Sequence, residues 1–130
     1  MEKLILDHVF AAETAFFSED QRVSIIRIFE KIKTVKNLSS EKTSVMFPYF
    51  SIAGKVTGDY GKGVNIGVVH EDGSEMIKEV LVKAGEEGKP FFNFIVNVTN
   101  IILKKGKYNV VVKNEKGVLV GKRNIFEVIE

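Results

Sequence analysis

Apolar and polar residues alternate along the C-terminal half of the chain. In residues 91–99, one set of alternate positions is apolar, and the other carries asparagine and threonine with Phe91 and Ile95 as apolar exceptions. Successive side chains of a strand point to opposite faces of a sheet, so this spacing predicts a strand with one buried and one wet face. The alternation recurs after residue 107 and near the C-terminus. The positions predicted to be buried are Phe92, Phe94, Val96, Val98, Tyr108, Val110, Val112, Phe126 and Val128.

Segments rich in glycine and charge separate the apolar runs at regular intervals. They lie at residues 58–63, 71–74, 85–90, 104–107 and 114–117. Asp72-Gly73 is typical of a hairpin turn, because both residues tolerate the positive φ that such turns require. Regularly spaced turns of this kind indicate strands joined by hairpins, and therefore an antiparallel all-β protein.

The first forty residues allow two interpretations. Residues 4–17 predict an opening strand, followed by a turn at 18–21. In 22–32, Ile25, Ile28, Phe29 and Ile32 are spaced for one face of a helix, but five β-branched residues favour a strand, which we adopt. Residues 38–43 are expected to hold a short helical turn. Pro48 cannot donate a ladder hydrogen bond, so its strand is expected to lie at an edge or to bulge there.

These segments add up to about eight strands in one domain spanning residues 1–130. A two-sheet antiparallel β-sandwich accommodates that number, and a closed β-barrel is the alternative. The chain has 130 residues, of which 45% are hydrophobic, so one core is expected to suffice without disulfides.

Composition limits the expected location of the protein and the classes of partner that it is expected to bind. The chain has no cysteine, and no cationic segment precedes an apolar run at its start, so a cytoplasmic location is expected. No run of about 18 apolar residues predicts a membrane span. Nineteen basic and seventeen acidic residues give a net charge of +2, which does not suggest a nucleic-acid partner.

Several short motifs resemble those of a family of small uncharacterised bacterial proteins. They are Asp7 in the opening strand, Ile28-Phe29-Glu30-x-Ile32 at the end of the next strand, and Phe47-Pro48 before the following one. Gly106-Lys107-Tyr108-x-Val110-x-Val112 and Phe126-x-Val128 are similar to the family's closing hairpin, whereas Arg27 stands where the family has glycine. The resemblance implies an immunoglobulin-like sandwich and no assigned activity.

Residue types suited to catalysis do not form a recognisable pattern. His8 and His70 each have an acidic neighbour, but adjacent strand residues point to opposite faces, so a plain surface or edge role is expected for both. The glycines at 58–63 with Lys62 do not match a phosphate-binding loop. We therefore expect no catalytic residue, no metal site and no cofactor.

Apolar residues on faces that should be wet suggest a binding function instead. One hydrophobic core does not account for five of these residues, namely Ile26, Ile28, Phe91, Ile95 and Val111. A strand that is apolar on both faces needs a second surface to shield the face that points away from the core. This surplus predicts a non-enzymatic interaction or structural module that forms a homo-oligomer or binds another protein, with Phe91 and Ile95 as binding residues. The alternative is a module for a small ligand or glycan that uses Tyr60 at a glycine-rich loop tip, with Tyr49 and Phe91 or Phe92 completing an aromatic platform.

Overall fold

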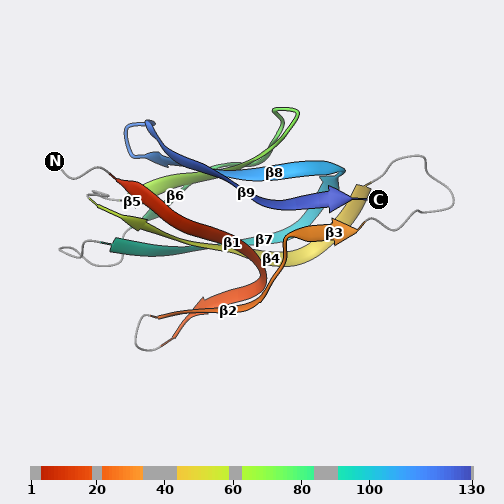
Figure 1. Ribbon diagram of the computed structural model, residues 1–130, viewed down its shortest axis with the longest axis horizontal. Coiled ribbons are helices and arrows are strands. Elements are labelled where there is room, and N and C mark those ends of the chain that lie inside the picture. Colours follow the sequence, from red (N-terminus) through yellow and green to blue (C-terminus); the bar gives the residue numbers. More distant parts are fainter. Residues whose placement is uncertain (1–3, 19–21, 34–43, 59–62, 84–90, 130) are drawn as a thin grey trace, which may run out of the picture.

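The computed structural model describes residues 4–18, 22–33, 44–58, 63–83 and 91–129. These residues contain strands and no helix, so the all-β prediction is confirmed (Figure 1). The strands are β1 (Ile5–Phe17), β2 (Val23–Ile28), β3 (Lys31–Lys33), β4 (Ser44–Thr57), β5 (Gly63–His70), β6 (Glu75–Lys83), β7 (Phe91–Lys104), β8 (Gly106–Asn114) and β9 (Leu119–Ile129). The helical turn expected at 38–43 lies outside the described residues.

The strands form two sheets that pack face to face. One sheet has the order β2-β1-β4-β7 and the other the order β3-β9-β8-β5-β6. All pairs are antiparallel except β3 with β9, which is parallel. The predicted two-sheet sandwich is therefore confirmed, and the two separate sheets do not form the alternative closed barrel.

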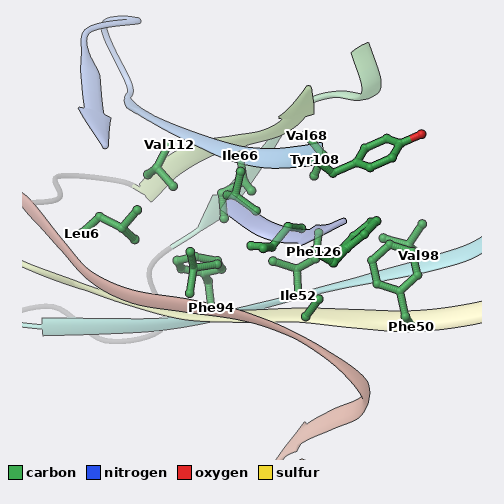
Figure 2. Packing of buried hydrophobic residues seen from close by; sticks show 14 of the residues in the cluster. Leu6, Phe50, Ile52, Ile66, Val68, Phe94, Val98, Tyr108, Val112 and Phe126 are labelled. Atoms are coloured by element: carbon green, nitrogen blue, oxygen red, sulfur yellow. The ribbon is translucent and has the colours of Figure 1, made fainter. Parts of the chain in front are cut away.

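Alternating apolar residues from both sheets fill the space between the layers (Figure 2). Phe94 and Ile52 rise from the four-stranded sheet toward Ile66, Val112 and other side chains of the five-stranded sheet. Every position predicted to be buried lies in this core or packs against it, and Val96 is the half-buried member. Burying each of the larger side chains contributes about 1.5–3 kcal/mol, so these inner faces hold most of the stability.

Residues 22–32 form strands rather than a helix, but two strands instead of one. β2 pairs with β1, whereas β3 pairs with β9 in the other sheet, so the chain crosses between the layers at Phe29-Glu30. Phe29 enters the core at this crossing, with its ring centroid 5.5–5.8 Å from those of Phe47, Phe50 and Phe126. This division accounts for nine described strands where about eight were expected.

Pro48 marks a place where β4 changes the face that it buries. β4 lies between β1 and β7, but its pairing with β1 ends at Ser51, so the residues on either side of Pro48 pair with β7 and not with β1. Phe47 and Phe50 lie in contact with centroids 5.5 Å apart, although a regular strand places residues three apart on opposite faces. Opposite Pro48, Asn100 has a φ of 49° and β7 also switches its buried positions, from Val98 to Ile101. β4 is an inner strand and its register with β7 is the same on both sides of Pro48, so the edge strand or bulge expected there is wrong; instead, both strands change their buried face at this point.

Candidate functional site

Phe91 and Ile95, the two described residues predicted to bind, lie on the face of the four-stranded sheet that points away from the core. Cross-strand pairing arranges this outer face in rows. In order along the sheet, the rows are Ile5–Thr57–Phe91, His8–Lys55–Asn93, Phe10–Ala53–Ile95 and Ile28–Ala12–Ser51–Asn97. Two apolar rows thus enclose a row of polar residues.

Large apolar side chains of the outer face are open to solvent. The exposed fraction is 53% for Ile5, 51% for Ile28, and 37% for both Phe10 and Phe91. The outer face of the five-stranded sheet is mixed: its middle strand β8 carries Lys107, Asn109, Val111 and Lys113. Lys113 forms an ion pair with Glu79 at 2.5 Å, and the flanking residues of its row, Leu81 and Leu119, are 49% and 58% exposed. The four-stranded sheet differs in that its exposed apolar side chains include two phenylalanines and occur in three of its four rows.

Polar side chains on the outer face are fixed by their neighbours. The Oδ1 atom of Asn97 accepts hydrogen bonds from the Tyr49 hydroxyl at 3.0 Å and from the buried Ser51 hydroxyl at 2.8 Å. The Nζ atom of Lys55 lies 4.7 Å from the centroid of the Phe91 ring, a favourable cation–π distance. These contacts hold the surface in one arrangement and reduce the entropy that a partner would have to remove on binding.

The structure brings together part of the surplus apolar set. Ile28, Phe91 and Ile95 share the outer face. Ile26 lies on the β1–β2 hairpin, which continues beyond the last residue that β1 pairs with β4, and Val111 lies on the other sheet.

The aromatic platform proposed for ligand binding does not form from the described residues. Phe92 points into the core, and Tyr49 pairs with Thr99, eight residues along β7 from Phe91. At a rise of about 3.3 Å per residue the two rows are about 26 Å apart. Tyr60 lies outside the described residues, so its role stays a prediction from the sequence.

His70 is buried, and the surface or edge role expected for it is wrong. Its exposed fraction is 6%, and its ring lies 4.9 Å from the Tyr108 ring, edge to face. Nε2 donates to the Lys105 carbonyl at 2.7 Å, and Nδ1 accepts the N–H of Asp72 at 3.1 Å. His8 does lie at the surface as expected, stacked on Phe10 with centroids 5.4 Å apart.

Asp72 links the β5–β6 hairpin to the end of β7. The Lys104 ammonium, together with the hydroxyl and N–H of Ser74, holds the pKa of the Asp72 carboxyl well below its usual range. Burial raises the pKa of the nearby Tyr108 hydroxyl, which accepts the Lys104 N–H at 2.9 Å. The Ser74 hydroxyl donates to Asp72 at 2.6 Å, and a carboxylate whose pKa is lowered in this way is too weak a base to activate a serine. The geometry indicates that this cluster fastens two turns together.

Sequence reasoning missed two contributors to the outer face, Phe10 and Ile5. A bulge between Leu6 and His8 shifts which residues of β1 point outward, and no local pattern marks such a bulge. The hydrogen bonds that join Asn97 to Tyr49 and Ser51 were not predicted either. They join strands that lie more than forty residues apart in the sequence, so no local pattern indicates them.

Comparison with family models, curated proteins and solved structures gives no match. Among the described residues, no group of three or more histidine, aspartate or glutamate side chains is placed to hold a metal ion. In the same part of the chain, no helix is long and apolar enough to cross a membrane.

Proposed function

We propose that the protein is a non-enzymatic interaction or structural module that self-associates through its four-stranded sheet. One observation carries this proposal: the solvent-facing side of that sheet exposes Ile5, Phe10, Ile28 and Phe91, whereas β8, the middle strand of the other sheet, presents lysine and asparagine around Val111. Apolar surface gathered in this way is stabilised when a second protein surface removes it from water.

The position of β7 adds a second reason to place the contact at this sheet. β7 carries both Phe91 and Ile95 and forms one edge of the sheet, so a partner reaches side chains and backbone at the same place. Contacts that combine apolar burial with main-chain hydrogen bonds are common in the recognition of strands.

The test is the solution mass of the full chain, measured by light scattering and sedimentation over a wide concentration range. We expect a dimer or larger assembly whose dissociation constant rises at least tenfold in the double variant Phe91→Ser, Ile95→Ser, equivalent to a loss of about 1.4 kcal/mol. Val111→Ser is the matched control, since Val111 is a half-buried residue on the outer face of the other sheet. A monomer at every concentration would contradict the proposal, as would equal weakening by the control.

A further inference from the structure

The edge strand β7 lacks the features that normally prevent edge-to-edge pairing. From Phe91 to Leu103 it contains no charged residue and no proline. The other edge strands of the two sheets, β2, β3 and β6, each carry at least one lysine, arginine or glutamate. Natural proteins use charged side chains on edge strands to oppose association, so the edge of β7 stands out as permissive.

The straight part of β7 has a definite centre. Its regular alternation runs from Phe91 to Thr99 and ends at Asn100, where φ becomes 49°. Ile95 is the midpoint of these nine residues. An antiparallel pairing of two identical strands has a two-fold axis, and the overlap of straight backbone is longest when that axis passes beside Ile95.

The polar residues on either side of Ile95 fit this axis. With the axis at Ile95, Asn93 of one copy faces Asn97 of the other. Tyr49 and Ser51 of β4 both donate to the Oδ1 atom of Asn97, which leaves the Nδ2 group as the end of the amide that is not bonded to β4. Within the described residues, that Nδ2 group donates to no other side chain or carbonyl. It is therefore available to donate to Asn93 of the second copy.

The inner side of β7 also favours a second copy. An apolar groove of about 420 Å³ lies where the sandwich opens between the edge strands β6 and β7. Ile77, Val80 and Val82 line it from β6, and Val96 and Val98 from β7. Val80 pairs with the buried Ile66 and so belongs to the inner face of its sheet, yet it is 43% exposed. A strand added beside β7 would continue the four-stranded sheet over this opening.

We propose that two copies of the chain associate by antiparallel pairing of their β7 strands around a two-fold axis at Ile95, which joins two four-stranded sheets into one continuous sheet. This inference rests on the proposed self-association, and it places the contact at the β7 edge rather than over the apolar rows of the outer face. Ile95 faces Ile95 of the second copy, Asn93 faces its Asn97, and Phe94 faces its Val96. No like charges meet in this register, because the paired segments carry none.

The chain contains no cysteine, so a single introduced thiol tests the axis directly. Residues that face each other across an antiparallel pair have Cα atoms about 4.5–5.5 Å apart, within the range that a disulfide spans. We expect the Ile95→Cys protein to form a covalent dimer under mild oxidation. Phe10→Cys is the matched control, because Phe10 lies in the same row of the outer face but two strands away from the edge.

Each result supports the inference or overturns it. Rapid cross-linking of Ile95→Cys without cross-linking of Phe10→Cys supports edge pairing. Cross-linking of Phe10→Cys, with or without Ile95→Cys, means that the outer faces pack on each other and overturns it. A wild-type dimer in which neither thiol cross-links also overturns the edge contact, but leaves the proposed self-association intact. A monomeric wild-type protein overturns both.

A second pair of variants keeps the test decisive if Ile95→Cys fails to fold by circular dichroism. Asn93→Cys and Asn97→Cys chains are each oxidised alone and as an equimolar mixture. The proposed register cross-links the mixture far more than either chain alone. Equal cross-linking in all three samples contradicts it.

Discussion

At the scale of single residues, the packing around His70 leaves no space for a side chain at position 106. Gly106 has a φ of 130°, a conformation that residues with a Cβ atom rarely adopt. A Cβ atom built there would overlap Nε2 of His70 and lie 2.8 Å from its Cε1 atom. Because Nε2 is also bonded to the Lys105 carbonyl, the ring cannot move without losing a buried hydrogen bond.

We expect Gly106→Ala to lower the free energy of unfolding by about 2–4 kcal/mol, since backbone strain and displacement of His70 act together. Chemical denaturation measures the loss, and the His70 ring resonances should shift. Gly117→Ala is the control: Gly117 also has a positive φ, of 83°, but nothing lies within 4 Å of its added Cβ. It should cost about 1–2 kcal/mol from strain alone. Equal losses in the two variants would mean that contact with His70 contributes nothing.

At the scale of elements, the Asp72–Lys104 ion pair joins the β5–β6 hairpin of one sheet to the end of β7 in the other. Folding lowers the pKa of Asp72. At pH values between the pKa of the folded chain and that of the unfolded chain, the unfolded chain therefore binds more protons than the folded one. The stability from this pair is therefore present above the ordinary aspartate pKa of about 3.9 and is lost as the pH falls below it.

We expect Asp72→Asn to be less stable than the wild type at pH 7, with a difference that shrinks as the pH falls from about 5 to about 2. Urea denaturation at several pH values measures both proteins. Lys104→Met should show the same loss, and the double variant should lose no more than either single one. A difference that stays constant with pH would show that the charge of Asp72 does not stabilise the fold.

The elements also show what the sequence could predict and where it failed. Alternation within β7 and β8 is local, and it correctly predicted the buried faces around Phe94 and Val110. The division of residues 22–32 depends on β3 finding β9 almost a hundred residues later, which no local pattern encodes. Arg27 has a φ of 54°, a conformation that glycine adopts more readily than arginine. The backbone preference of arginine therefore does not predict the bend before Phe29.

The candidate site divides in the same way. The position of Phe91 and Ile95 on the outer face was predictable because they interrupt a local alternation; their role in binding stays a prediction. The burial of His70 was missed because it depends on Tyr108 and Lys105, which belong to a different hairpin. Residues recognised by their departure from a local pattern are predictable, whereas those defined by contacts between distant strands require the structure.

At the scale of the whole molecule, the order of the strands places a charge-free edge next to an opening in the sandwich. β7 ends the four-stranded sheet and β6 ends the five-stranded sheet on the same side, with the apolar groove between them. Two-fold pairing of β7 would extend one layer across both molecules and bring their two grooves together. The register of that pairing decides which side chains meet, so it can be tested with charge.

We expect the double variant Asn93→Lys, Asn97→Glu to dimerise at least as tightly as the wild type, because each introduced lysine would face the introduced glutamate of the second copy. Asn93→Glu, Asn97→Glu places like charges in the same positions and should dissociate at least tenfold more readily. Both variants carry glutamate at position 97, and its carboxylate can accept the bonds from Tyr49 and Ser51, so any difference between them arises at position 93. Sedimentation at low salt measures the two constants, and added salt should narrow the gap because it screens exposed charges. If the two variants associate equally, Asn93 does not face Asn97, and the two-fold axis does not lie at Ile95.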